Sequence, residues 1–120
     1  MISEEIRREL RDVGLDVDEQ TARFMDNEDM FIKYFHKFFE SADSVVDQLR
    51  TATAAGDLGE VERTAHALKG LAGNIGLGGV FGPAQKIVSD LRAGKTDSYR
   101  IDFQQLFYSY AAALAVSRKL

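Results

Sequence analysis

The stretch Thr64-Ala65-His66-Ala67-Leu68-Lys69-Gly70-Leu71-Ala72-Gly73-Asn74-Ile75-Gly76 sets the pattern for the whole chain. Apolar residues recur in and just before it at steps of three and four, the spacing of a helix that buries one side in a bundle. They are Leu58, Val61, Ala65, Leu68, Ala72 and Ile75. An α-helix turns about 100° per residue, which puts His66 roughly 130° from the middle of this stripe. We therefore expect the imidazole to point away from the core.

The face that carries His66 also carries a lysine and several glycines. Lys69 lies about 60° to one side of His66 and Gly70 about 40° to the other, with Gly73 within about 20° of His66. Glycine inside a helix costs about 1 kcal/mol relative to alanine, so its use here indicates that a partner must come close to the imidazole. Alternatively, the glycines only let a neighbouring helix pack close. That reading does not explain why His66 and Lys69 share a face.

The rest of the chain is predicted to be helical, because no run alternates with period two. Short helices are expected after caps at Ser3 and Asp16. The longest helix is expected over residues 28–55 and contains an aromatic cluster that would lie in the core. Polar residues around 41–44 could kink this helix or split it in two. Gly56-Asp57 and Leu77-Gly78-Gly79 are expected turns around the His66 helix. Two more helices complete the chain. One covers about residues 80–92, with Pro83 near its first turn, and the other runs from caps at 96–98 to near the C-terminus. The predicted fold is all-α: one domain over residues 1–120, an antiparallel up-down four-helix bundle with two short N-terminal helices covering one end.

Composition narrows the classes of function that fit. The chain has 120 residues, no cysteine and a formal net charge of −4. Disulfide and thiolate chemistry are excluded, and an acidic chain without a basic cluster is a poor nucleic-acid binder. No apolar run reaches the roughly eighteen residues of a membrane span, and no secretory signal is evident. We therefore expect a cytoplasmic protein without nucleic-acid or membrane partners. Monomer is the default, although the sequence leaves the oligomeric state open.

The stretch around His66 resembles the signature of histidine-containing phosphotransfer (HPt) domains, which serve multistep phosphorelays in two-component signal transduction. The match comprises His66, Lys69, Gly70 and Gly76 at the family's spacing, within a chain of the family's size. The resemblance implies that His66 accepts a phosphoryl group from the aspartate of one receiver domain and passes it to another. Lys69 would stabilise the phosphate charge, Gly70 would provide clearance, and Gly76 would be structural. The implied partners are response-regulator receiver domains, a hybrid sensor kinase, or both.

Two positions depart from the family's pattern. Leu71 replaces a small or hydroxylated residue, which could widen an apolar docking surface. Many members hold the histidine ring with a Gln or Glu on the following helix, and counting from His66 puts Val88 at that position. Gln85, one turn earlier, is the alternative. If neither serves, the orientation of the ring is unexplained.

The residues themselves support a phosphoryl carrier that does not use ATP alone. A neutral imidazole is a nucleophile near neutral pH, and an adjacent lysine can balance phosphoryl charge. The chain has no nucleotide-binding loop, and Gly76-Leu77-Gly78-Gly79 follows a helix and lacks the lysine, so it is interpreted as a turn. We expect no enzyme activity and no cofactor of its own, with Mg²⁺ supplied by the partner receiver domain. His36 is interpreted as structural or solvated, because the chain offers no pattern of metal ligands around it.

Two other classes of function remain. A non-phosphorylated helical adaptor that binds a receiver or sensor kinase would keep the bundle but tolerate the loss of His66. A metal- or cofactor-binding bundle has too few ligands. The sequence does not identify the donor, the acceptor or the signal, or whether the chain is a free protein or an excised domain.

Overall fold

The computed structural model describes residues 1–120, which form six helices and no strand. The helices are Glu4–Asp12 (α1), Val17–Ala22 (α2), Glu28–Ala55 (α3), Leu58–Ile75 (α4), Gly78–Arg92 (α5) and Tyr99–Ser117 (α6). The all-α prediction is confirmed. Helix α3 runs unbroken through residues 41–44, where Ser41, Asp43 and Ser44 face solvent while Ala42 and Val46 stay in the core.

Four helices begin at residues whose side chains accept a hydrogen bond from the first turn. Ser3, Asp16, Asn27 and Asp57 accept from the backbone N–H three residues later, at 3.1–3.3 Å. Such bonds satisfy donors that have no partner inside the helix. Ser98 is the exception among the predicted caps. It precedes α6 but makes no cap bond; its hydroxyl instead accepts from Lys86 Nζ and donates to Asp90 Oδ2, both at 3.1 Å.

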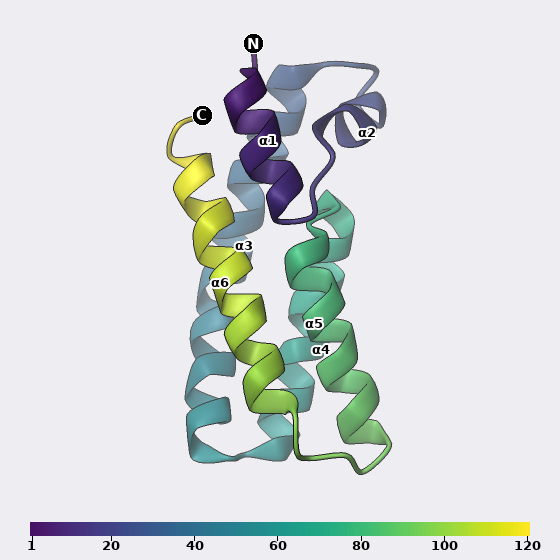
Figure 1. The fold of residues 1–120 in the computed structure, drawn as a ribbon, viewed down its shortest axis with the longest axis vertical. Coiled ribbons are helices and arrows are strands. Elements are labelled where there is room, and N and C mark those ends of the chain that lie inside the picture. The colour runs from purple at the N-terminus through teal and green to yellow at the C-terminus, as the bar shows by residue number, and fades with distance from the viewer.

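Helices α3, α4, α5 and α6 form an elongated bundle, and α1 and α2 lie at one end (Figure 1). The whole chain measures 44 × 22 × 21 Å. Helix α4 packs against α3 and α5, and α6 packs against the same two helices, so α4 and α6 are diagonal partners. The turns between α3 and α4 and between α4 and α5 span only Gly56-Asp57 and Gly76-Leu77. Such short connections make successive helices antiparallel.

Helix α5 begins two residues earlier than its sequence pattern predicts. The N–H groups of Gly78 and Gly79 donate to the carbonyls of Gly14 and Val13 at 3.1 and 2.8 Å, so the end of α1 caps α5 in place of a side chain. Glycine is needed for this approach, since a Cβ on Gly79 would lie 2.5 Å from the Val13 carbonyl oxygen. Gly78 and Gly79 are therefore part of the helix instead of the predicted turn, and Pro83 falls in its second turn.

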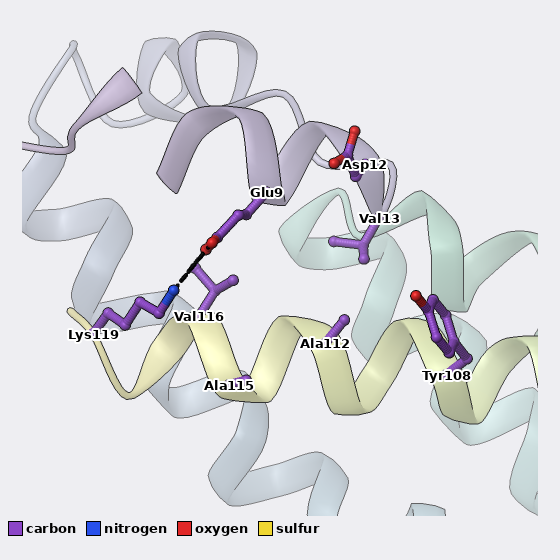
Figure 2. Close-up of a pocket in the computed structure, with 8 residues that line it drawn as sticks. All are labelled: Glu9, Asp12, Val13, Tyr108, Ala112, Ala115, Val116 and Lys119. Carbon is purple, nitrogen blue, oxygen red and sulfur yellow. Dashed lines mark hydrogen bonds and ion pairs between the residues drawn. The ribbon is translucent and has the colours of Figure 1, made fainter. Parts of the chain in front are cut away.

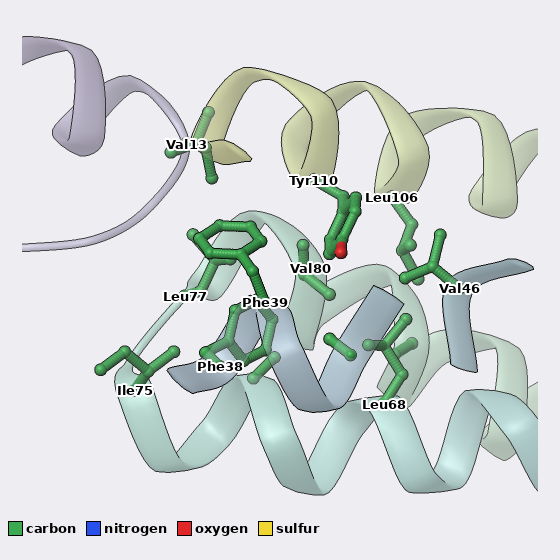
Figure 3. Close-up of a cluster of buried hydrophobic side chains, with 14 of the residues drawn as sticks. Val13, Phe38, Phe39, Val46, Leu68, Ile75, Leu77, Val80, Leu106 and Tyr110 are labelled. Carbon is green, nitrogen blue, oxygen red and sulfur yellow. The ribbon is translucent and has the colours of Figure 1, made fainter. Parts of the chain in front are cut away.

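Aromatic and aliphatic side chains from all four long helices fill the core (Figure 3). Phe31 and Phe35 are fully buried, and Phe39 packs edge-on against Phe35 at 5.1 Å between ring centroids. Tyr110 reaches in from α6 to contact Phe39, and its hydroxyl donates to Asp43 at 3.2 Å. Burial raises the pKa of Tyr110, and the nearby Asp43 carboxylate adds to the shift. The predicted assignment of the α3 aromatic cluster to the core is confirmed, although Tyr34 is partly exposed.

Candidate functional site

His66 lies near the middle of α4 and is exposed, as the helical wheel predicts. The predicted stripe on the opposite side of α4 is buried from Val61 to Ile75, although Leu58 at its start is 40% exposed. The imidazole makes no hydrogen bond and no ion pair within the chain. It is therefore held only by its own helix and is open to an approaching molecule.

Lys69 and Gly70 stand on the same face, one turn after His66. The half-buried Lys69 side chain forms no ion pair within the chain, so its ammonium is available to an incoming anion. A Cβ added to Gly70 would meet no atom within 4 Å, which means that open space surrounds this position. The clearance role of Gly70 stays a prediction.

Gly73 has a different role from Gly70. A Cβ at Gly73 would lie 3.3 Å from the ring of Phe81 on α5, so this glycine lets the neighbouring helix pack close. Gly73 therefore fits the packing interpretation, whereas the clearance interpretation stays a prediction for Gly70. Only Gly70 keeps the surface beside His66 open.

Contacts across the α4–α5 seam fix which residues lie level with each other. Phe81 covers Gly73 near one end, and Arg92 pairs with Glu62 near the other. Because the two helices are antiparallel, counting inward from either pair puts Val88 level with His66 and Gln85 level with Lys69. Val88 is 3% exposed and apolar, and the exposed Gln85 makes no hydrogen bond with His66. Neither residue orients the ring in the free chain.

An ion pair next to His66 was not predicted from the sequence. Arg92 Nε lies 3.4 Å from Glu62 Oε2, and Glu62 precedes His66 by one turn on the same side of α4. The spacing of four residues between Glu62 and His66 could have predicted that the carboxylate lies beside the imidazole. The pairing of Glu62 with Arg92 could not be predicted, because it depends on how α4 and α5 pack. The charged residues one turn from the imidazole are therefore Glu62, paired with Arg92, and Arg63, paired with Glu60, on one side and the unpaired Lys69 on the other.

A shallow apolar cleft of about 180 Å³ lies between α3 and α4, beside the end of α2. Leu71 and Ile75 line it from α4, while Phe24 and Tyr34 stack on each other at 5.1 Å on its other side. Leu71 thus contributes to an apolar surface, and its suggested role in docking a partner stays a prediction. At about 100° per residue, Leu71 and Ile75 lie about 140° and 180° around α4 from His66, so the cleft is on the side of α4 toward α3.

The second histidine is structural. His36 is half-buried, and its Nε2 donates to the carbonyl oxygen of Ser117 at 2.9 Å, which ties α3 to the last turn of α6. Gly76 closes α4 in the left-handed conformation at φ 75°, with the side chain of Gln20 packed against it. Both residues have the structural roles expected from the sequence.

The comparisons with known proteins give one match. The family model described as Hpt domain matches residues 33–115, which includes α4 and most of the bundle. No curated protein and no solved structure matches the chain. None of the six helices has the length and apolar character needed to cross a membrane.

Proposed function

The chain belongs to the Hpt domain family, whose members carry phosphoryl groups in phosphorelays and interact with receiver domains or kinases, and we propose that His66 is the phospho-acceptor of this one. The donor would be an aspartyl phosphate on a receiver domain, and the acceptor the aspartate of another receiver. The observation that carries the proposal is the exposed, unpartnered imidazole of His66 beside the unpaired ammonium of Lys69 and the open space at Gly70.

The chemistry needs few groups from this chain. The unprotonated nitrogen of His66 attacks phosphorus, an N–P bond forms, and the P–O bond to the aspartate breaks with its electron pair remaining on the carboxylate. Phosphoryl transfer depends mainly on positioning and on stabilisation of charge on the equatorial oxygens. Lys69 supplies one cation for those oxygens, and a receiver-bound Mg²⁺ would supply the rest. The second transfer is the same reaction in reverse with a different receiver.

The apolar cleft between α3 and α4 supports docking of a receiver domain beside the His66 face. Leu71, five residues after His66, and the stacked Phe24–Tyr34 pair offer apolar contact area. Apolar contact of this kind contributes affinity without taking part in the reaction. The docked partner would then cover Gly70 and bring its aspartate to the imidazole.

A label-transfer assay tests the proposal. Receiver domains of the source organism are phosphorylated with labelled phosphate and Mg²⁺ and mixed with the chain. We expect a label that is stable to alkali and labile to acid on the wild type, and none on His66→Gln. His36→Gln is the matched control, because it removes the other imidazole and leaves the α4 face intact. Lys69→Ala should slow transfer about tenfold, as expected for loss of an exposed charge partner.

Absence of label on the wild type with every receiver would contradict the proposal. The helical adaptor is then the remaining candidate. It predicts that His66→Ala leaves receiver binding and biological output intact, whereas a carrier loses its output.

A further inference from the structure

The turn between α2 and α3 contains the only residues other than glycine that have a positive φ. Met25 and Asp26 have φ of 56° and 62°. Their N–H groups donate to the carbonyls of Ala22 and Thr21 at 3.3 and 2.9 Å, and so close the last turn of α2. A helix end with these bonds usually has glycine in the left-handed position, because a Cβ is strained there. The other left-handed residues of this chain are all glycines, namely Gly14, Gly56, Gly76 and Gly94.

The Met25 side chain gains nothing within the chain that would offset this strain. It is 94% exposed, so it contributes almost no packing to the fold. Short polar side chains such as that of Asp26 adopt the left-handed conformation more readily than a long apolar one does. Strained residues of this kind gather at binding sites. The advantage of a methionine at this position is therefore to be sought in contact with another molecule.

Other apolar side chains lie close to Met25. Phe24 precedes it and stacks on the exposed Tyr34, and both rings line the cleft between α3 and α4. Met30 is also exposed and lies one helical turn before Tyr34 on the same side of α3. We call Phe24, Met25, Met30 and Tyr34 the Met25 rim. Three of these four residues precede residue 33, where the match to the family model begins.

We propose that the Met25 rim contacts the receiver domains that exchange a phosphoryl group with His66, and that Met25 adapts this contact to more than one receiver. The inference rests on the proposed function. A standard interface covers about 800 Å² of each partner, which equals a disc about 16 Å in radius. Asn74 lies about 12 Å along α4 from His66, and its carbonyl accepts from Arg23 Nη1 at 3.2 Å. A partner seated over His66 therefore reaches the α2–α3 turn at the edge of its footprint.

Methionine suits a surface that must meet two partners. Because His66 is a single acceptor, the receiver that donates the phosphoryl group and the receiver that takes it must occupy the same face in turn. Methionine has three rotatable side-chain bonds and a polarisable sulfur, so one side chain can pack against partners of different shape. Such residues are common on surfaces that bind several proteins. Met25 thus adds apolar contact area to either complex.

The charge beside the rim favours the same partner. Lys37 is the one charged residue that lines the cleft, and it forms no ion pair within the chain. Its Nζ lies 5.5 Å from the centre of the Tyr34 ring. The acids nearest in the sequence to Met25, Asp26 and Asp29, are not among the lining residues. A receiver that holds Mg²⁺ beside its aspartate needs carboxylates to do so, and Lys37 is a cation available to an acidic surface of that kind.

Phosphotransfer kinetics test the role of Met25. Transfer to and from His66 is measured against the concentration of each receiver of the source organism that labels the chain. Met25→Gly should raise the half-saturating concentration about three- to tenfold in both directions and leave the limiting rate unchanged, because contact area is lost while the reacting groups are untouched. It should unfold at the same or a higher urea concentration, since glycine relieves the strain. Met25→Leu keeps an apolar side chain and should stay near the wild type.

Tyr108→Ser is the matched control, because it removes an exposed aromatic side chain away from the rim. Tyr108 is 76% exposed on α6, at one end of a cleft of about 380 Å³ whose other end has the Glu9–Lys119 ion pair (Figure 2). Helix α6 is diagonal to α4 across the bundle. This variant should therefore keep the half-saturating concentration and the limiting rate of the wild type.

The outcomes separate this inference from the proposed function. If no receiver labels the wild type, the proposed function fails and the inference fails with it. If receivers label the wild type and Met25→Gly keeps the same half-saturating concentrations, the inference alone is overturned. Met25→Leu as weak as Met25→Gly would also overturn it, because an apolar side chain would then not be what the contact needs. A wild type that sediments as a dimer, with Met25→Gly as a monomer, would assign the rim to a second copy of the chain instead.

Discussion

Arg92 Nε lies 3.4 Å from Glu62 Oε2 across the α4–α5 seam, one turn before His66. The Glu62 carboxylate would repel a phosphoryl group on His66, and Arg92 neutralises it. Arg92→Ala leaves Glu62 unpaired, so we expect phosphorylation of His66 to slow about two- to tenfold, the size expected for a largely exposed pair. Glu62→Gln should recover the rate in the double variant. Transfer rates of the four proteins in a double-mutant cycle measure the coupling, and strictly additive effects would contradict the prediction.

Substitutions at Gly70 and Gly73 distinguish space needed by a partner from close packing between helices of the chain. A Cβ at Gly70 meets nothing within 4 Å, so Gly70→Ala should stabilise the free chain by about 1 kcal/mol through helix propensity. If a receiver approaches His66 at this position, the same substitution should slow phosphotransfer. Urea unfolding and the label-transfer rate measure the two effects.

Gly73→Ala is the matched control for Gly70→Ala. Its Cβ would lie 3.3 Å from the Phe81 ring, which must shift slightly, so little or no stability should be gained. Its phosphotransfer rate should stay near that of the wild type. Equal rates for Gly70→Ala and the wild type would show that no partner needs the space at Gly70.

The helices and the outward direction of His66 could be predicted from the sequence because both follow from local rules. Caps at Asn27 and Asp57 and the 3.6-residue period fix each helix within a few residues. The start of α5 could not be predicted, because its cap comes from carbonyls of Val13 and Gly14, more than sixty residues away.

The surroundings of His66 depended in the same way on contacts between helices. The Glu62–Arg92 pair and the contact of Phe81 with Gly73 require the register of α4 against α5. Periodicity within one helix contains no information on that register. The face of α4 was therefore predictable, and its neighbours were not.

The junction between α1 and α5 should be sensitive to a single methyl group. In Gly79→Ala the new Cβ would lie 2.5 Å from the Val13 carbonyl oxygen and 2.7 Å from Ser109 Oγ. Because backbone must move to relieve the overlap, we expect a loss of about 1–3 kcal/mol in the free energy of unfolding, measured with urea. Gly59→Ala is the control, since its Cβ would meet only Asp57 Oδ1 at 3.8 Å, and it should not destabilise the chain. Equal stability of the two variants would mean that α1 does not hold the start of α5.

The cluster around Lys86 should make stability depend on pH in the acid range. Lys86 Nζ donates to Asp90 Oδ2 and to Asp102 Oδ2, both at 2.9 Å. The hydrogen bond from Lys86 lowers the pKa of Asp90 below its usual range, and the hydroxyl of Ser98 adds to the shift. A carboxyl whose pKa is lowered on folding stabilises the fold above its unfolded pKa of about 3.9, and this contribution is lost as the pH falls through the folded pKa. Urea unfolding of the wild type and Asp90→Asn from neutral pH to acid should show the variant less stable at neutral pH. The difference should shrink as the pH falls below about 4, whereas a constant difference would mean that Asp90 does not titrate with folding.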